Sequence, residues 1–140
     1  MAYWSIQPEV AGEIGEGSDV DYNVHPPIVR SLEYELSDWL GDHILESFPV
    51  YVVSEQLGEA LTRSGLRAFE LRDCRITLSE DAQEILEGVE LPKFKWLVVT
   101  GTAGREDLGV NDNARLVVSD QALEVIQSFP TQNAEIDQFS

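Results

Sequence analysis

Three side chains that could bind a metal ion lie close together near the start of the chain. Asp19 and Asp21 offer carboxylate oxygens, and His25 adds an imidazole within the same seven residues. Hard cations prefer carboxylate ligands, and imidazole is a common ligand of transition metals. The spacing matches neither a calcium-binding loop nor the paired histidines of a zinc-binding helix. We therefore predict no metal ion and no cofactor here, and a metal-dependent hydrolase remains a third hypothesis for function.

Two serines occupy the same place in two nearly identical stretches of sequence. Residues 52–56 read Val-Val-Ser-Glu-Gln and residues 117–121 read Val-Val-Ser-Asp-Gln, and an apolar helical pattern follows each. A serine between a strand and a helix could be a nucleophile, but that turn needs small residues on both sides of the serine. Ser54 and Ser119 lack such neighbours and suit the N-cap of a helix, followed by an acidic residue that favours the helix dipole. We predict that both serines are structural.

A glycine-rich stretch, Gly101–Gly109, could expose backbone amides to a phosphate group. It lacks the lysine and hydroxyl residue of a phosphate-binding loop, no obvious helix follows it, and Glu106 and Asp107 would repel phosphate. We predict a loop between two strands. His25 and His43 are the only histidines, and no serine, threonine or cysteine has a convincing nucleophile context. The sequence therefore predicts that the protein is not an enzyme.

The hydrophobic pattern predicts the elements that would carry these residues. Alternation and continuous apolar runs indicate strands near residues 3–6, 32–36, 48–53, 66–69, 73–78, 94–99, 115–118 and 134–139. Helical periodicity indicates three helices, which follow Ser54, Ser79 and Ser119 and end near residues 65, 86 and 129. The single cysteine, Cys74, is predicted to face a core from a strand. Residues 8–27, rich in glycine, proline and acid, are predicted to form a long loop.

These elements predict the fold class and the number of domains. A chain of 140 residues with 43% hydrophobic residues fits one domain with a substantial core. These strands and three short helices predict a single α+β domain over residues 1–140, with the helices packed on a mixed, mostly antiparallel sheet. No apolar run is long enough to span a bilayer, and residues 1–5 do not resemble a signal peptide. We expect a cytoplasmic protein.

Charge restricts the classes of partner. The formal net charge is −17, and residues 1–62 carry twelve Asp and Glu residues against a single Arg. Nucleic acid and anionic membranes would be repelled, so we predict neither as a partner. We instead predict a basic protein partner, although an acidic surface that serves only solubility is the alternative. The predicted contact residues are Glu13, Glu16, Asp19 and Asp21 in the loop, and Glu33, Glu35, Asp38 and Asp42 beyond it.

Several stretches resemble the small acidic immunity proteins of bacterial polymorphic-toxin systems, including contact-dependent and type VI secretion systems. These stretches are His25-Pro26-Pro27-Ile28-Val29, Phe48-Pro49-Val50-Tyr51-Val52-Val53-Ser54-Glu55, Gly65-Leu66-Arg67-Ala68-Phe69, Leu91-Pro92-Lys93-Phe94-Lys95-Trp96-Leu97, Gly101-Thr102-Ala103-Gly104 with Asp107, and Leu116-Val117-Val118-Ser119-Asp120-Gln121-Ala122-Leu123. The resemblance covers residues 25–139 and implies a protein that is made beside a toxin and neutralises it in the cytoplasm by occlusion. It assigns no contact residue and no toxin identity. The alternative is a non-catalytic adaptor or regulatory module that binds a basic protein.

Overall fold

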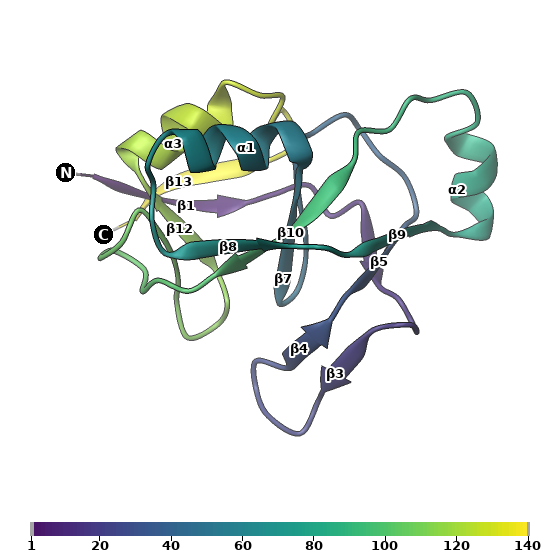
Figure 1. Ribbon diagram of the computed structural model, residues 1–140, viewed down its shortest axis with the longest axis horizontal. Coiled ribbons are helices and arrows are strands. Elements are labelled where there is room, and N and C mark those ends of the chain that lie inside the picture. The colour runs from purple at the N-terminus through teal and green to yellow at the C-terminus, as the bar shows by residue number, and fades with distance from the viewer. Residues whose placement is uncertain (1, 140) are drawn as a thin grey trace.

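The computed structural model describes residues 2–139 and has the α+β composition expected from the sequence (Figure 1). The three helices in this part of the chain are α1 (Glu55–Arg63), α2 (Glu80–Ile85) and α3 (Asp120–Gln127). The strands are β1 (Tyr3–Gln7), β2 (Gly12–Ile14), β3 (Asp19–Asp21), β4 (Ile28–Ser31), β5 (Glu33–Leu36), β6 (Ile44–Ser47), β7 (Val50–Ser54), β8 (Phe69–Arg72), β9 (Arg75–Leu78), β10 (Phe94–Val99), β11 (Leu108–Val110), β12 (Leu116–Ser119) and β13 (Glu135–Phe139).

The strands form four small sheets rather than the single sheet that the sequence predicted. Two four-stranded antiparallel sheets have the orders β11-β12-β1-β13 and β6-β7-β10-β8. A third sheet, β2-β5-β9, contains the one parallel pair of strands within residues 2–139, formed by β5 and β9. The fourth is the hairpin β3-β4, which projects from the body of the molecule (Figure 1).

Strand β7 separates two hydrophobic clusters. Successive side chains of a strand point to opposite faces of the sheet. Tyr51 and Val53 therefore join the cluster under α1 and α3, and Val50 and Val52 join the cluster against β5. This explains why β7 is buried at every position and why its sequence is a continuous apolar run. The sheet that contains β7 is thus the middle layer of the domain.

All three helices begin at the predicted serines. The hydroxyl oxygens of Ser54, Ser79 and Ser119 accept hydrogen bonds from the backbone amides three residues further on, at 3.1, 3.1 and 3.2 Å. The predicted helix starts are confirmed, and so is the capping role of Ser54 and Ser119. Helices α1 and α3 lie side by side over the sheets, whereas α2 lies apart at the end of β9 (Figure 1).

The two stretches that repeat in the sequence form two similar units. In the first, β6 and β7 form a hairpin that leads into α1, and in the second, β11 and β12 form a hairpin that leads into α3. We call these the first and second ββα units. Each central strand also pairs antiparallel with a further strand, so that Ser54 lies opposite Phe94 of β10 and Ser119 lies opposite Tyr3 of β1. The two four-stranded sheets therefore share one topology, although β1 comes from the N-terminal end of the chain.

Several local predictions were wrong. Residues 8–27 are not a continuous loop, because β2 and β3 lie within them. These strands have three residues each, and pairing with β5 and β4 stabilises them rather than an apolar pattern of their own. The strand predicted at 66–69 begins only at Phe69. Cys74 lies in the connection between β8 and β9, where it is partly buried against the second cluster.

No helix within residues 2–139 is long and apolar enough to cross a membrane.

Candidate partner-binding surface

Four of the predicted contact carboxylates gather on the sheet β2-β5-β9. Glu33 and Glu35 alternate along β5 with the buried Tyr34, so they point away from the core. Glu13 of β2 lies directly opposite Glu35. Glu16 follows in the next turn, and the four carboxylates line a hollow of about 320 Å³. We call Glu13, Glu16, Glu33 and Glu35 the acidic face.

Three members of the acidic face form no ion pair with any of the described residues. Within residues 2–139, no Lys or Arg forms an ion pair with Glu13, Glu16 or Glu35. Like charges directly opposite each other on neighbouring strands destabilise a sheet, by an amount on the order of 0.2–1 kcal/mol. The Glu13–Glu35 pair therefore lowers the stability of the folded protein. A basic partner would turn that repulsion into attraction.

Glu33 has a structural role. Its carboxylate accepts hydrogen bonds from the Thr77 hydroxyl at 2.8 Å and from the Gly17 amide at 2.6 Å, and Arg75 lies 3.8 Å away. The hydrogen bond from Thr77, then that from Gly17 and the charge of Arg75, lower the pKa of Glu33. Gly17 lies so close to this carboxylate that a Cβ atom would collide with it. Glu33 thus holds the turn between β2 and β3 in place.

Asp19 and Asp21 lie on the projecting hairpin and share one cation. Arg30 of β4 approaches Asp19 at 3.5 Å and Asp21 at 3.8 Å. Exposed ion pairs of this length contribute little to stability, but they reduce the negative charge available to a partner. The two aspartates belong to β3, which directly follows the turn that Glu33 holds in place. They are secondary members of the candidate surface.

The last two predicted contact residues differ in exposure. Asp38 is half-buried and accepts a hydrogen bond from the Trp39 amide at 2.7 Å. Asp42 is only 1% exposed, and its two oxygens accept hydrogen bonds from the backbone and side-chain nitrogens of Asn133, at 2.8 and 3.1 Å. These hydrogen bonds hold the loop before β13 in place. Because the Asp42 carboxylate is buried and already hydrogen-bonded, we exclude Asp42 from the candidate surface.

A buried carboxylate that the sequence analysis did not single out supports the same region. Glu9 is 5% exposed and accepts hydrogen bonds from the backbone amides of Leu40 and Asp42, at 2.8 and 3.4 Å. Burial raises the pKa of Glu9, although these hydrogen bonds act in the opposite direction. Its place in an acidic stretch gave no sign of burial, because only the tertiary fold brings the two amides to it.

Ser54 and His43 form a contact that resembles part of a catalytic site. The Ser54 hydroxyl oxygen lies 2.7 Å from the His43 Nδ1 atom, and burial lowers the pKa of His43. Ser54 is completely buried. A nucleophile must reach its substrate. This serine is therefore placed to cap α1 rather than to attack a substrate.

The predicted loop at Gly101–Gly109 follows β10 as expected, but its last residues belong to β11, a strand that was not predicted before the one at 115–118. The amide of Thr102, which could have faced a phosphate, donates instead to the Glu106 carboxylate at 2.6 Å. At the hairpin, Asp19 and Asp21 bind Arg30, and the His25 ring stacks on Phe48 at a centroid distance of 5.8 Å. No group of three or more metal-binding side chains occurs among residues 2–139.

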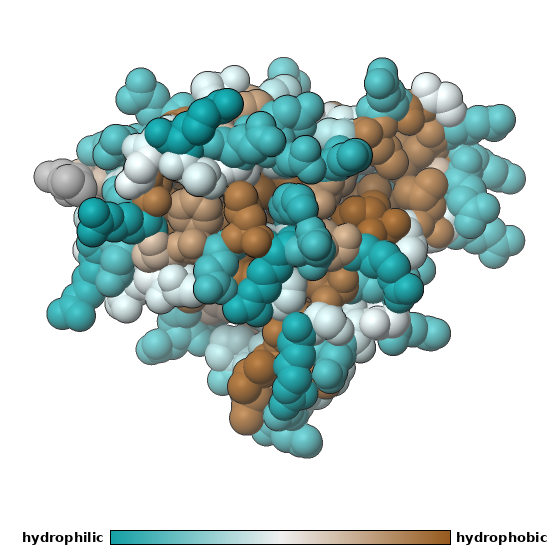
Figure 2. Space-filling view, in the orientation of Figure 1, coloured by the Kyte–Doolittle hydropathy of each residue, from teal (hydrophilic) through white to brown (hydrophobic). Residues whose placement is uncertain are grey.

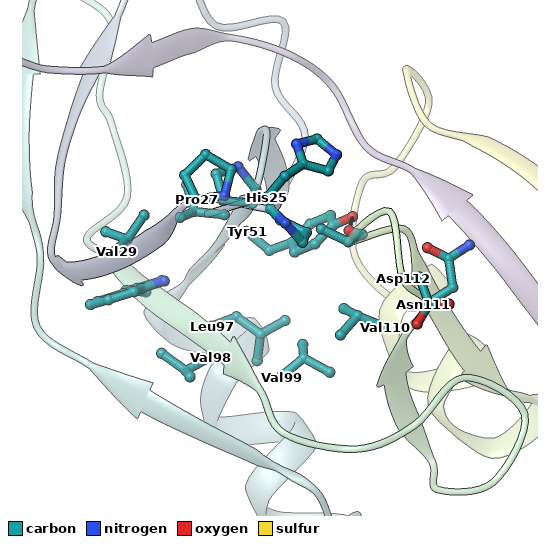
Figure 3. A pocket seen from close by; sticks show the side chains of 15 residues that line it. His25, Pro27, Val29, Tyr51, Leu97, Val98, Val99, Val110, Asn111 and Asp112 are labelled. Carbon is teal, nitrogen blue, oxygen red and sulfur yellow. Dashed lines mark hydrogen bonds between the residues drawn. The ribbon is translucent and has the colours of Figure 1, made fainter. Parts of the chain in front are cut away.

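A groove lies beside the hairpin, and the sequence did not predict it. It has a volume of about 560 Å³ and lies between the end of the hairpin and strands β10 and β11 (Figure 3). Pro26, Pro27 and Val29 belong to one wall. The stretch His25–Val29 stood out in the sequence, but it forms a groove only because the fold places strands β10 and β11 opposite it.

No protein-family model and no curated protein matches this sequence.

Proposed function

We propose that this protein is a non-catalytic inhibitor, an immunity protein that binds a basic toxin domain in the cytoplasm and blocks it by occlusion. The observation that carries the proposal is the opposition of Glu13 and Glu35 with no cation beside either carboxylate among the described residues. Such a pair costs folding stability. A positively charged partner compensates for that cost only in the complex.

The overall charge supports the same proposal. At a net charge of −17, the long-range field of the protein attracts basic surfaces and accelerates their association. An inhibitor of this kind needs a stable scaffold and a complementary surface, and it needs no catalytic group of its own. The resemblance to immunity proteins in residues 25–139 points to a toxin as the partner.

The decisive experiment uses the gene next to this one. A toxin domain encoded immediately upstream should kill cells when expressed alone and should be harmless when it is co-expressed with this protein. The two proteins should co-purify as a complex. Survival without a complex would contradict occlusion, and a complex with a basic protein that is not toxic would favour the adaptor alternative.

Charge-reversal variants locate the surface. Glu13→Lys combined with Glu35→Lys should slow association with the toxin domain and reduce protection in cells. The matched control, Glu84→Lys with Glu87→Lys, changes the net charge equally at exposed residues near α2. Equal effects of the two pairs would mean that only the overall charge matters.

Salt provides an independent measure of the electrostatic contribution. Raising the salt concentration from about 50 to about 500 mM shortens the screening length from about 14 to about 4 Å. We expect the association rate to fall steeply and the dissociation rate to change less. An affinity that does not depend on salt would contradict the role of the acidic face.

Neutralisation separates binding from folding. Glu13→Gln should increase the free energy of unfolding by a few tenths of a kcal/mol, because it removes the repulsion from Glu35. The same change should weaken binding of the toxin domain. A stabilised variant that binds less tightly is expected only if the carboxylate pair is kept for a partner.

A further inference from the structure

We propose that the groove between the β3-β4 hairpin and strands β10 and β11 receives an apolar side chain from a basic segment of the partner protein. This inference rests on the proposed function, because the segment belongs to the same toxin domain. It adds a second contact of a different kind: the acidic face attracts the partner, and the groove anchors it.

Most side chains that line the groove are apolar, and they come from several elements. Pro27 and Val29 come from the hairpin side, Val98 and Val99 from β10, and Val110 from β11, as Figure 3 shows. Pro26 and Pro49 extend the wall, and proline has no backbone N–H to offer a ligand. The interior therefore favours an apolar group.

The one hydroxyl group among the lining side chains is already occupied. The Tyr51 hydroxyl donates to the Ala114 carbonyl at 2.6 Å and accepts from the Leu116 amide at 3.0 Å. Of the other polar side chains in the lining, those of His25, Asn111 and Asp112 are exposed, and the Asn111 Oδ1 atom already accepts from the amides of Asn113 and Arg115. The indole N–H of the buried Trp96 is the single further donor, and it has no acceptor among residues 2–139. A strongly polar ligand would lose its hydration in the groove without gaining enough hydrogen bonds in return.

Exposed apolar side chains also occur on the hairpin and on the turn beside the groove. The described residues include eight large hydrophobic side chains that are exposed, and four of them belong to the hairpin and the turn between β6 and β7. They are Tyr22, Val24, Ile28 and Phe48, with exposed fractions of 70%, 44%, 51% and 47%. Figure 2 shows apolar surface on the projecting hairpin. Phe48 stacks on His25, which lines the groove, at a centroid distance of 5.8 Å, so exposed apolar surface adjoins the groove at this point. Exposed apolar surface beside a pocket is typical of a contact with a macromolecule. A small molecule inside the groove would leave Phe48 in water, whereas a protein segment would cover it.

Charge selects the segment. Asp112 lines the groove, is exposed, and has no ion pair among residues 2–139. The nearest cation on the hairpin, Arg30, is held by Asp19 and Asp21. Basic residues beside the anchoring side chain would therefore meet a carboxylate, and acidic ones would be repelled. An apolar anchor in a pocket with a polar rim is the usual arrangement of an interface hot spot.

The test uses a short capped peptide, Lys-Gly-Trp-Gly-Lys, added at millimolar concentration to the full-length, isotope-labelled protein. We expect NMR shifts in the methyl groups of Val29, Val98, Val99 and Val110. Replacing the tryptophan of the peptide with alanine should weaken binding at least tenfold, and replacing both lysines with glutamate should abolish it. Absence of shifts, or equal binding of the tryptophan and alanine peptides, would overturn the inference. Equal binding of free indole would also overturn it, because the groove would then be a small-molecule site.

Two variants at the groove and one control guard against misfolding. Val29→Trp fills the groove and Val29→Gln makes it polar, and each should weaken peptide binding at least tenfold. The matched control, Val89→Trp, lies outside the groove in the connection between α2 and β10 and should bind normally. Unchanged shifts in β1 and β12 verify that a variant is folded.

The same variants separate this inference from the proposed function. If Val29→Trp no longer binds the peptide but still protects cells and binds the toxin domain with full affinity, the groove is not the anchor and the immunity function stands. If the peptide binds as expected but the upstream gene product is not toxic, the groove is a basic-segment site and the immunity function is wrong.

Discussion

The first and second ββα units solve the same structural problem with different chemistry. In each unit the amide of the capping serine donates to the carbonyl of the residue before the hairpin, from Ser54 to His43 at 2.9 Å and from Ser119 to Asp107 at 2.8 Å. In each unit the serine hydroxyl also contacts the side chain of that same residue, at 2.7 Å to His43 and 2.9 Å to Asp107. The backbone arrangement is shared, and only the side chain that meets the serine differs.

This difference shows which features the fold requires. Both serines are buried, so each hydroxyl needs a partner in addition to the helix amide that it binds. A carboxylate or an imidazole satisfies that need equally well. The contact between Ser54 and His43 is therefore one of two ways to complete a cap, and its likeness to a catalytic pair reflects the architecture of the unit.

The largest expected effect tests whether the helices of the two units contribute equally. Leu61 of α1 and Ile126 of α3 are fully buried in the same hydrophobic cluster. Replacing either residue with alanine should cost about 3 kcal/mol of unfolding free energy, measured by urea denaturation, because each change leaves a cavity. A cost below about 1 kcal/mol in only one unit would show that the cluster depends mainly on the other helix.

The caps should have the next largest effect. Ser54→Ala and Ser119→Ala should each destabilise the protein by about 1 kcal/mol, because a helix amide loses its acceptor. Ser31→Ala, at an exposed position on β4, is the control and should have little effect. Protection against the toxin domain should remain in any folded variant. Loss of protection by folded Ser54→Ala with normal binding would instead indicate catalysis.

A pH titration should distinguish the two units through His43. Burial lowers the pKa of His43 in the folded protein, whereas a histidine in the unfolded chain has a pKa of about 6.5. As the pH falls below about 6.5, the unfolded state binds a proton at His43 before the folded state does, and this favours unfolding. The stability that comes from keeping His43 neutral is therefore complete above about pH 6.5 and is lost as the pH falls through the lower pKa of the folded state. The stability difference between the natural protein and His43→Asn should change over that range. A constant difference would show that the His43 imidazole is not shielded.

The smallest expected effect concerns the acidic residue after each cap. Asp120 accepts hydrogen bonds from the Trp4 indole nitrogen at 2.8 Å and from the Ala2 amide at 3.0 Å, and these bonds lower its pKa. Glu55, its counterpart in the first unit, makes no comparable side-chain hydrogen bond in residues 2–139. Asp120→Asn should shift tryptophan fluorescence and slightly lower stability at neutral pH, and Glu55→Gln should leave the fluorescence unchanged. Identical spectra for both variants would contradict the role of Trp4.

The sequence by itself determined the features that depend on neighbouring residues. The three helices, their serine caps, the buried run of β7 and the α+β class all follow from periodicity and capping within a few residues. The acidic character of the N-terminal half was also visible. The signal for each of these features lies within a few neighbouring residues, so it can be recognised without knowing which elements pack against it.

The tertiary structure alone decided which residues meet. It placed Glu13 opposite Glu35, buried Asp42 against Asn133, and brought the hairpin close enough to β10 and β11 to form the groove. Strands of three residues, such as β2 and β3, depend on their pairing partners and leave no periodic pattern in the sequence. Whether a carboxylate is exposed or bonded inside depends on amides that lie many residues away. Such contacts are set by the packing of the whole chain, and a local pattern cannot encode them.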